Sequence, residues 1–578
     1  MDNIKTGARG GLFLLKQTDL ADTFFPEDLT EEHKMIQRTA QQFITKEVFP
    51  RNKEIEEQQD FDVVVELLKK AGNLGLLAHS IPEKYGGLGL DKISKGIVGE
   101  ALGNAGGYSV AHSNHTCIAT LPITYYGTQA QKEKYLPKLA SGEFIGAYCL
   151  TEPGAGSDAM AAKTTAVLND AKTHYLLNGT KIYITNAQFS DTFIVYAKVD
   201  GEKFTAFVVE KDFPGLSLGP EEKKMGIKGS STRSVIFEDC EVPVDNVIGE
   251  IGKGHIVAFT VLNLGRFNLG SACTGGAKYA FKQTIGHVRQ RKQFQQVLAD
   301  FGATKEKIAK MAARLYAAES IQYRTSYLLE ESLAGLDQEE DSCLVRAGMS
   351  EYAMECAICK VYGSETLDYL ADEGVQLHGG VGFISEYPIE QIYRDSRINR
   401  IFEGTNEVNR LLLTGEFLKK SMKGLLPYKE AVKSAFDQLA KESANTAKGL
   451  VEDLRALYLV LAEFARRKYG NDLEAQQEVL MKLSDLAIHL YASESVVLRT
   501  EKNTQDKELK KQLRDTVLEE AVNNTFIIVR QLEQELLEDE QAIRRQIYAS
   551  LTSHSFSQSI YRNRNIAETM YESGEYAG

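Results

Sequence analysis

The spacing of apolar residues changes twice along the chain and separates regions of different secondary structure. From about residue 28 to 142 apolar positions recur at helical spacing, and the first helix runs to Val48, ahead of Pro50. Asp28 and Glu31 match a capping box at its start. Helices over Val63–Leu74 and Gln129–Leu139 and a Pro- and Gly-rich loop over Ile81–Gly89 follow. The pattern predicts an N-terminal helical domain.

Near Glu143 the apolar period shortens to that of strands. Five short segments are rich in β-branched and aromatic residues: Tyr175–Leu177, Thr180–Thr185, Thr192–Tyr196, Phe204–Val209 and Ser234–Phe237. Turn dipeptides such as Asn178-Gly179 and Asp200-Gly201 separate them. We therefore expect an antiparallel β-domain, resembling a small barrel, over residues 143–249.

Helical spacing returns at Gly252 and continues to about Lys420. Between Lys253 and Lys278 the only Lys, Arg, Asp or Glu is Arg266, in a stretch that is otherwise apolar and rich in glycine. Such a helix should be buried, and a buried cation must find an anion or several acceptors. A structural ion pair and a role in a ligand site are both compatible with this pattern.

Pro427 marks a further boundary. Long charged helices follow over Val451–Lys468, Leu473–Val497 and Asp506–Glu538. The sequence thus predicts an α+β multidomain protein: an N-terminal helical domain (1–142), a middle β-domain (143–249), a helical bundle (250–426) and an extra C-terminal helical domain (427–578).

Composition narrows the class of protein. The 578 residues carry a net charge of −13 and no basic aromatic patch, which argues against nucleic-acid binding. The seven scattered cysteines indicate a reducing compartment, and no signal or long apolar run is recognisable, so we expect a cytoplasmic protein. We interpret Cys356 and Cys359 as core residues. His112 and His115 should lie on a helix surface or line a pocket.

Glu403 is the strongest candidate for chemistry. It follows apolar Ile401 and Phe402, precedes Gly404, and lies just before a helix that starts near Asn406. An apolar setting raises the pKa of a carboxylate and suits it to act as a general base. The alternative is a Glu that merely benefits from the dipole at a helix N-terminus.

Three other segments offer ligand-binding groups. The first segment lies at the junction of the helical and β regions, where Gly154 and Gly156 let main-chain amides approach a ligand and Thr151 and Ser157 add hydroxyls. A second glycine cluster spans Gln376–Phe383, and Arg291–Phe294 offers cations and an aromatic face at a helix end. Each segment alone could equally be an ordinary turn.

Taken together, these segments resemble the acyl-CoA dehydrogenase family over about residues 30–423. The matching motifs, in order, are Tyr148–Asp158, Tyr183–Thr185, Arg291–Phe294, and Gln376–Gly380 with Phe402–Thr405. The extra C-terminal domain is similar to that of the very-long-chain branch and its bacterial relatives. The resemblance implies FAD as cofactor, no metal, and α,β-dehydrogenation of a long-chain fatty acyl-CoA to the trans-2-enoyl-CoA in β-oxidation.

The resemblance also implies roles for individual residues. Glu403 would be the catalytic base. The flavin would be held by Tyr148, Leu150, Thr151, Gly156, Ser157, Tyr183, Ile184 and Thr185. The FAD of a neighbouring subunit would be reached by Arg291, Phe294, Gln376, Leu377, Gly379 and Gly380, and Thr405 and Glu407 would contact FAD after the base. The acyl-CoA site would be lined by Ser157, Asn263, Arg266 and Gly404.

The chain departs from the family pattern at four positions. Tyr183 stands where Trp is usual, His378 where an apolar residue is common, and Gln295 where Gly is common. Some members carry the base one residue before the position of Arg266, but this chain has Gly265 there. Glu403 is therefore the only candidate of the two.

Partners follow from the same resemblance. We expect electrons to pass to electron-transfer flavoprotein, and a homodimer or tetramer. An acyl-CoA oxidase that uses oxygen and a non-enzymatic assembly factor of the same fold remain alternatives. The segment Arg544–Leu551 could form an amphipathic helix on a membrane surface, but packing against neighbouring helices is the more usual outcome.

Overall fold

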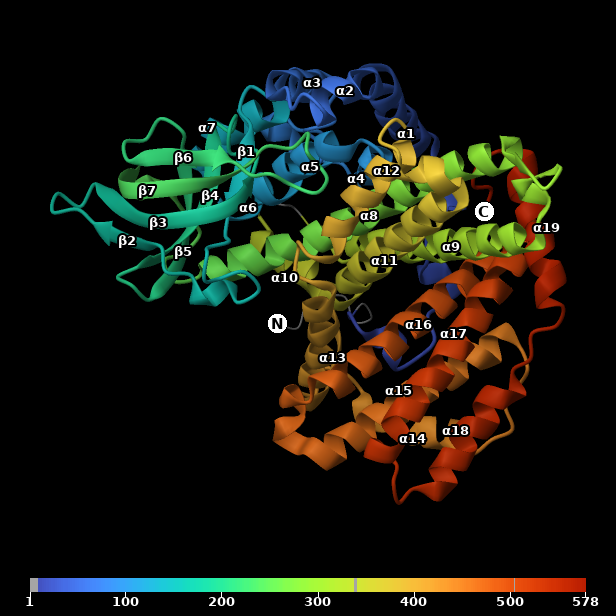
Figure 1. Cartoon of the computed structure of the whole chain (residues 1–578). Coiled ribbons are helices and arrows are strands. Elements are labelled where there is room, and N and C mark those ends of the chain that lie inside the picture. The colour runs from blue at the N-terminus through green and yellow to red at the C-terminus, as the bar shows by residue number, and fades with distance from the viewer. Residues whose placement is uncertain (1–8, 337–339, 504) are drawn as a thin grey trace.

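A computed structural model describes residues 9–336, 340–503 and 505–578 (Figure 1). The N-terminal part is helical, as predicted. Its helices are α1 (Glu31–Phe43), α2 (Asn52–Glu56), α3 (Phe61–Asn73), α4 (Lys92–Leu102), α5 (Gly106–Asn114), α6 (Leu121–Tyr126) and α7 (Gln129–Ser141). After α1 the chain continues through a π turn (Ile44–Val48) and a 3-10 turn (Phe49–Arg51). Pro50 lies in the first turn of the 3-10 segment, where its missing N–H costs nothing.

The predicted capping box at Asp28 and Glu31 is wrong by two residues. Thr30 is the N-cap of α1, and its hydroxyl accepts a hydrogen bond from the His33 N–H at 3.2 Å. Asp28 instead accepts from the Phe25 N–H at 2.9 Å and closes the preceding 3-10 turn. Asp28 and Thr30 both have side chains that can cap a helix, and local spacing alone does not show which of them caps α1.

The expectation that His112 and His115 lie at a surface or pocket is also wrong. Both are fully buried. His112 Nε2 lies 3.2 Å from the Leu76 carbonyl, and His115 Nε2 lies 2.9 Å from the Leu139 carbonyl. Burial lowers the pKa of His112 to about 3 and that of His115 to about 4, so both rings are neutral structural links between helices.

The middle domain is a mostly antiparallel sheet. Its strands are β1 (Gly146–Cys149), β2 (Thr165–Leu168), β3 (His174–Thr185), β4 (Thr192–Val199), β5 (Lys203–Glu210), β6 (Leu216–Glu221), β7 (Thr232–Pro243) and β8 (Val247–Ile248). The order is β6-β7-β3-β2-β4-β5-β8, with β1 also beside β4. The pairings of β4 with β1 and β2 are parallel, which corrects the expectation of a purely antiparallel domain. Over residues 146–248 the pairings form an open path rather than a closed ring.

Only one of the two predicted turns joins separate strands. Asp200 and Gly201, with φ of 54° and 77°, form the turn between β4 and β5. Asn178-Gly179 instead lies inside β3, at a shift in its register with β7. A Cβ on Gly179 would lie 2.5 Å from the Thr164 hydroxyl, so the glycine permits close packing rather than a reversal of the chain.

The helical bundle is built around α8 (Gly254–Gln290). Its other helices are α9 (Gly302–Glu331), α10 (Ser342–Glu351), α11 (Ala353–His378), α12 (Pro388–Ser396) and α13 (Asn406–Met422), and a hairpin of β9 (Lys292–Gln293) and β10 (Gln296–Val297) follows α8. Among the described helices α8 alone is long and apolar enough to cross a bilayer, contrary to the sequence reading, but 72% of its most apolar window is buried inside the protein. It is a core helix.

The C-terminal domain confirms the predicted long helices. It consists of α14 (Tyr428–Leu439), α15 (Ala447–Tyr469), α16 (Gln477–Lys502), α17 (Lys507–Leu536), α18 (Gln541–Ser553) and α19 (Ser559–Ser573). α18 contains the amphipathic segment, and its apolar residues Ile547 and Leu551 are buried within the protein. That face packs inward rather than toward a membrane.

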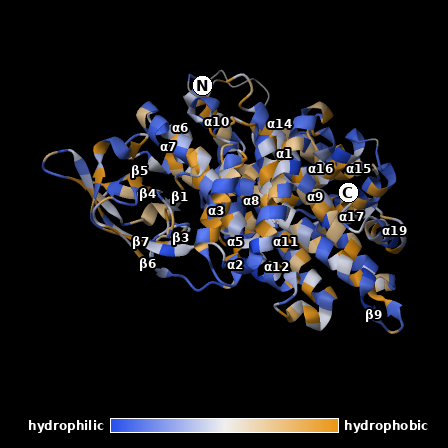
Figure 2. Cartoon of the chain, turned by 90° about the horizontal axis from the view of Figure 1, so that it is seen from above, coloured by the Kyte–Doolittle hydropathy of each residue, from blue (hydrophilic) through white to orange (hydrophobic). Residues whose placement is uncertain are grey.

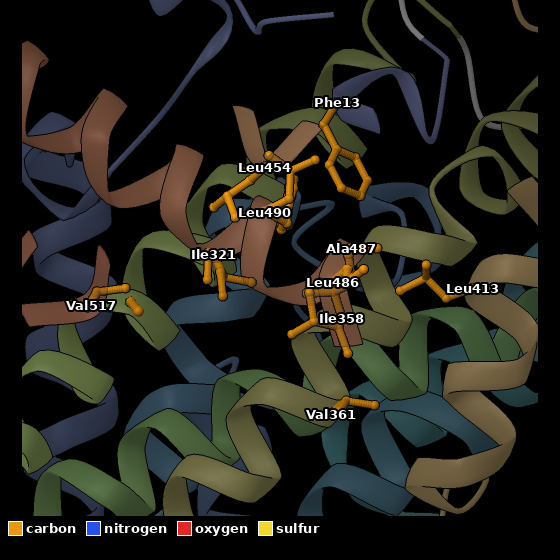
Figure 3. Close-up of a cluster of buried hydrophobic side chains, with 14 of the residues drawn as sticks. Phe13, Ile321, Ile358, Val361, Leu413, Leu454, Leu486, Ala487, Leu490 and Val517 are labelled. Atoms are coloured by element: carbon orange, nitrogen blue, oxygen red, sulfur yellow. The ribbon is translucent and has the colours of Figure 1, made fainter. Parts of the chain in front are cut away.

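The helical bundle and the C-terminal domain share one continuous hydrophobic core. Figure 3 shows Ile358 of α11, Leu413 of α13, Leu454 of α15 and Leu490 of α16 in this core, together with Phe13 from the N-terminal segment. Cys356 and Cys359 belong to it as well, which confirms their reading as core residues. The C-terminal domain is therefore fused to the bundle rather than tethered to it.

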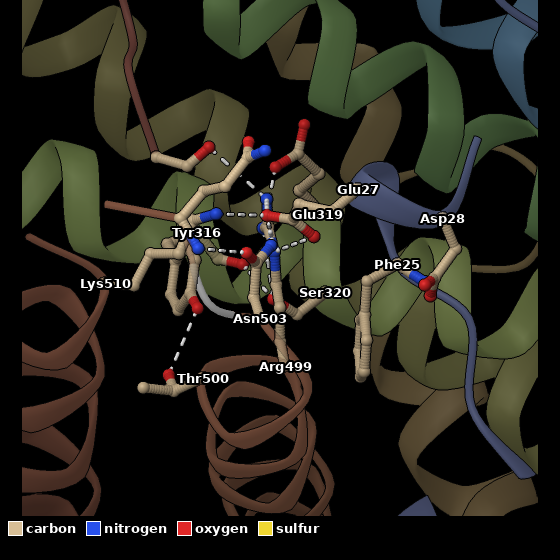
Figure 4. Close-up of polar contacts among 12 residues, drawn as sticks. Phe25, Glu27, Asp28, Tyr316, Glu319, Ser320, Arg499, Thr500, Asn503 and Lys510 are labelled. Carbon is tan, nitrogen blue, oxygen red and sulfur yellow. Dashed lines mark hydrogen bonds and ion pairs between the residues drawn. The ribbon is translucent and has the colours of Figure 1, made fainter. Parts of the chain in front are cut away.

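An ion network around the buried Arg499 side chain also joins these parts (Figure 4). Arg499 of α16 pairs with Glu27 at 2.8 Å and with Glu319 of α9 at 2.7 Å, and Lys510 of α17 pairs with Glu27 at 2.8 Å. Burial raises the pKa of Glu27, but Arg499 and Lys510 together outweigh this effect and the pKa falls to about 2. Residues around Glu27 thus bind to the C-terminal domain, although they precede α1 in the sequence.

Candidate active site

Glu403 lies in a tight turn just before α13, as predicted. Glu403 and Gly404 both have left-handed backbone conformations, with φ of 56° and 78°. The Asn409 amide holds this turn by donating to the carbonyls of Gly404 at 2.8 Å and Thr405 at 3.0 Å. A non-glycine residue in this region is strained, and such strain persists only where the surroundings enforce it.

The Glu403 carboxylate points at the backbone of α8. A Cβ on Gly265 would lie 2.7 Å from Glu403 Oε2 and 3.0 Å from Oε1, so only glycine leaves room for the carboxylate. Oε2 is shielded from solvent and has no hydrogen-bond partner among the described residues. Burial raises the pKa of Glu403 to about 7, and the charges of Arg266 and Lys360 oppose the rise. A carboxyl group with this pKa can accept a proton near neutral pH.

Arg266 faces the same carboxylate from α8. It is 7% exposed, its Nη1 donates to Asn263 Oδ1 at 2.8 Å, and its Nε has no partner within the described chain. It makes none of the ion pairs found among the described residues. Burial lowers its pKa, and the charge of Glu403 acts in the opposite direction. The incomplete pairing favours the ligand-site reading of Arg266 over a structural ion pair.

The residues expected to hold the flavin ring form one surface, which we call the ring platform (Tyr148–Ser157 and Tyr183–Thr185). The Ile182 N–H donates to the Thr151 carbonyl at 2.9 Å, and Lys181 Nζ lies 3.2 Å from the Leu150 carbonyl. Lys181 also pairs with Glu152 at 2.7 Å, and both side chains are buried. These contacts fix the glycine-containing loop against β3.

The ring platform suits a flat polar heterocycle. The hydroxyls of Thr151, Ser157 and Thr185 make no hydrogen bond with the described residues, and the ring of Tyr183 is 63% exposed. A Cβ on Gly156 would meet nothing within 4 Å, so the main chain there is open to a ligand. The side chains of Leu150 and Ile184 are buried in the protein core, so only their main chains can face a cofactor. This donor set fits an isoalloxazine ring.

Six further residues expected to bind the cofactor lie far from Glu403, near the C-terminal ends of α8 and α11. We call this set the distal group (Arg291, Phe294, Gln376, Leu377, Gly379 and Gly380). Gly265 and Arg291 are 26 residues apart along α8, a rise of about 39 Å. Figure 2 shows β9 on the opposite side of the molecule from the strands of the middle domain.

Local geometry exposes the distal group. Phe294 and Gln295, with φ of 50° and 68°, form the two-residue turn of the β9–β10 hairpin, and Phe294 is 88% exposed. The rings of His287 and His378 stack with centroids 4.2 Å apart and join the end of α8 to the end of α11. His378 therefore contributes to the packing of this group, although an apolar residue is common at its position.

Thr405, Glu407 and Gly404 lie beside the base. The Thr405 hydroxyl caps α13 by accepting from the Val408 N–H at 3.2 Å, and Glu407 is exposed in the first turn. The structure thus brings Glu403, Gly404, Asn263 and Arg266 together and keeps the distal group apart from them.

Two residues at the site escaped the sequence reading. Lys181 and Lys360 are both fully buried cations in otherwise apolar segments. Each offers the same signal as Arg266, because a charge in an apolar stretch requires a partner. Lys181 supports the ring platform, and Lys360 contacts the turn that follows Glu403.

Comparisons with known proteins identify this arrangement. Models described as acyl-CoA dehydrogenase N-terminal and middle domains match residues 30–143 and 147–240, and two described as its C-terminal domain match 252–417 and 453–542. A crystal structure of an acyl-CoA dehydrogenase complexed with FAD from Bacillus anthracis is 47% identical, with a TM-score of 0.95 over 99% of this chain and 100% of that one.

Named proteins of similar sequence are also acyl-CoA dehydrogenases. A probable acyl-CoA dehydrogenase of Bacillus subtilis is 51% identical over 86% of this chain and 85% of its own length. The human mitochondrial very long-chain specific acyl-CoA dehydrogenase is 34% identical over 88% of this chain and 78% of its own. The chain therefore belongs to the acyl-CoA dehydrogenase family of FAD-dependent oxidoreductases.

Proposed function

We propose that the protein converts long-chain fatty acyl-CoA to trans-2-enoyl-CoA, with Glu403 as the base that removes the α-proton. The observation that carries the proposal is the Glu403 carboxylate itself. Its Oε2 is shielded and unpartnered, its pKa is raised to about 7 by burial, and it faces Gly265 and the incompletely paired Arg266. Such a group can take a proton from a weakly acidic carbon that is held against it.

The residues around Glu403 prepare the substrate for that step. The α-proton of a thioester leaves only if the negative charge that develops on the thioester oxygen is stabilised. The backbone N–H of Glu403, in its left-handed turn, is the donor that we assign to this oxygen. Asn263 and Arg266 line the adjacent space on α8. Bound FAD supplies the acceptor for the β-hydride, and the ring platform would hold its flavin ring.

The distal group supports a dimer as the functional unit. At about 39 Å along α8 from Gly265, Arg291 is too distant to serve the flavin that faces its own Glu403. The distal group of a second copy would complete the FAD site. Exposed Phe294 and the exposed glycines Gly379 and Gly380 are then covered in the assembly.

The long-chain preference rests on relatedness to very long-chain specific enzymes, and the electron acceptor rests on the family resemblance of the sequence. We assign electron-transfer flavoprotein as acceptor and a cytoplasmic location. Nothing in the site favours an oxygen-using oxidase, and the presence of Glu403 with an intact ring platform speaks against a purely structural assembly factor.

A substrate and acceptor series tests this function. Anaerobic flavin bleaching is followed with saturated acyl-CoAs of 4 to about 20 carbons. The rate of flavin reduction should be highest with the long chains. Reoxidation of the reduced protein should be fast with electron-transfer flavoprotein and slow with air. Preference for short or branched chains would contradict the substrate assignment, and rapid reoxidation by air with formation of peroxide would identify an oxidase.

A further inference from the structure

Lys360 of α11 contacts the turn that carries Glu403. Its side chain is fully buried, and its Nζ donates to the Gly404 carbonyl at 2.8 Å and to Asn406 Oδ1 at 2.6 Å. Asn406 is itself fixed, since its Nδ2 donates to Ser364 Oγ at 3.1 Å and to Glu365 Oε1 at 3.0 Å. Lys360 thus ties the turn to α11 through a bond network that leaves it little freedom.

The charge of Lys360 has no carboxylate partner. Among the described residues it makes no ion pair, although a buried ammonium without a counter-ion is costly. A neutral donor could hold the Gly404 carbonyl at a lower cost. The groups that face Lys360 are Cys273, Glu403, Arg266 and Glu365, and burial lowers its pKa to about 8. A purely structural clamp does not require this cation.

The groups that face the Glu403 carboxylate are few. Arg266 approaches from α8 and Lys360 from α11, and both act against the effect of burial on its pKa. Cys117 and Tyr148 also lie within its electrostatic reach, and each is neutral because burial raises its pKa. Lys360 is therefore one of two cations that set the proton affinity of the base.

We propose that Lys360 is a positioning residue for Glu403: it clamps the left-handed Glu403–Gly404 turn and supplies a positive charge that keeps the carboxylate ready to ionise. This deepens the proposed function, on which its catalytic meaning rests. The clamp acts through the Gly404 carbonyl, and the charge acts through space on the carboxylate. Loss of the charge should raise the pKa of Glu403, because the ionised form loses a stabilising neighbour.

A substrate-free titration of Glu403 tests the electrostatic part directly. The infrared band of the protonated carboxyl is assigned by difference from Glu403→Gln, and its loss with rising pH is followed in the FAD-containing protein. We expect a midpoint near 7 in the wild type. In Lys360→Met the midpoint should rise by about one pH unit, and an unchanged midpoint would overturn the proposal. Where Lys360→Met does not fold, Lys360→Gln removes the charge, retains a donor, and carries the same test.

Lys278→Met is the matched control. Lys278 lies on α8 and pairs with Glu100 at 2.7 Å and with Glu319, so its loss removes a half-buried lysine that does not face Glu403. This variant should lose stability and keep the Glu403 midpoint of the wild type. An equal shift in both variants would mean that the midpoint reports general loosening, and it would contradict a specific role for Lys360.

The pH–rate profile of single-turnover bleaching with a long-chain acyl-CoA tests the catalytic part. In Lys360→Met the rate at pH 7 should fall about fivefold, since a rise of one unit in the pKa of Glu403 from about 7 lowers its ionised fraction at pH 7 from about one half to about one tenth. A rate that stays low at alkaline pH reports the lost clamp, whereas full recovery reports lost charge alone. A wild-type profile in Lys360→Met would overturn the role. Failure of the proposed function would show itself differently, as no bleaching in the wild type while the infrared titration still responds.

Discussion

Two clusters of buried charge in this protein follow opposite rules. Around Arg499 every charge is matched: the guanidinium contacts Glu27 and Glu319, donates to the Gly578 carbonyl at 3.3 Å, and lies 4.4 Å from the centre of the Tyr316 ring. Around Glu403 the charges are left incomplete. Glu403 Oε2 and Arg266 Nε have no partner among the described residues, and Lys360 contacts only uncharged oxygens.

The difference separates structural charge from reactive charge. A network in which all donors are used resists change and joins segments that are distant in sequence, as Arg499 joins the region before α1 to α9 and α16. A carboxylate without partners is destabilising in the folded protein, but it remains free to bind a proton. Pairing, rather than burial, therefore distinguishes the Glu403 cluster from the Arg499 cluster.

The largest expected effect is a loss of stability when the matched cluster around Arg499 is broken. Arg499→Met leaves buried Glu319 and partly exposed Glu27 with only their lysine partners, Lys278 and Lys510, and should lower the free energy of unfolding by about 3 kcal/mol. Denaturant unfolding measures this, with exposed Arg530→Met of α17 as a control expected to change it by less than about 0.5 kcal/mol. FAD content per folded protein should not change. A loss below about 1 kcal/mol would show that the network is not structural.

The next-largest expected effect is a gain in stability on substitution of Glu403. The rise in the pKa of Glu403 from 4.5 to about 7 means that the folded protein holds a proton that the unfolded chain releases, at a cost of about 3 kcal/mol once both are ionised. This cost is absent below pH 4.5 and complete above pH 7. Glu403→Gln should therefore be more stable than the wild type by up to about 3 kcal/mol at pH 8 and equal to it at pH 4.5.

Unfolding curves at the two pH values check this, with Glu407→Gln as the control. Glu407 is exposed in the first turn of α13, and its pKa is lowered by a hydrogen bond from its own backbone, so this substitution should not stabilise the protein at pH 8. Equal stability of Glu403→Gln and wild type at pH 8 would contradict the raised pKa of Glu403 and the stability that its ionisation costs.

The smallest of the three effects displaces the base without removing it. In Gly265→Ala the new methyl group would lie within 3.0 Å of the Glu403 carboxylate, which must move. A displacement of about 1 Å can cost about a hundredfold in rate, while alanine itself favours the helix. Gly415→Ala, in α13 where a Cβ meets nothing within 4 Å, is the matched control and should keep the wild-type bleaching rate. Equal rates in both variants would show that Gly265 does not shape the site.

Local patterns predicted the elements well and the contacts between them poorly. The start of the helix after Glu403 and the long C-terminal helices are local properties. The sequence predicts the first at Asn406, where α13 begins, and the ends of the C-terminal helices to within five residues. The contact of Gly265 with Glu403 and the docking of Glu27 on Arg499 join distant segments and have no local signal.

Where local reading failed, tertiary packing decided the outcome. Asn178-Gly179 has the composition of a turn, but β3 continues through it because Thr164 packs against the glycine. Asp28 has the composition of a helix cap, but it closes the turn before Thr30. The candidate site shows the same division: the segments were recognisable, whereas the split between the ring platform and the distal group was implied only by the family resemblance, and its physical reason is the length of α8.

The most direct measurement is an anaerobic titration of the purified FAD-containing protein with palmitoyl-CoA, followed by flavin absorbance, in the wild type and in Glu403→Gln. The substitution keeps the shape of the side chain and removes the base. We predict bleaching of the wild type and a rate at least about a thousandfold lower in the variant, with FAD retained in both. Comparable bleaching in both proteins would place the base elsewhere and contradict the account.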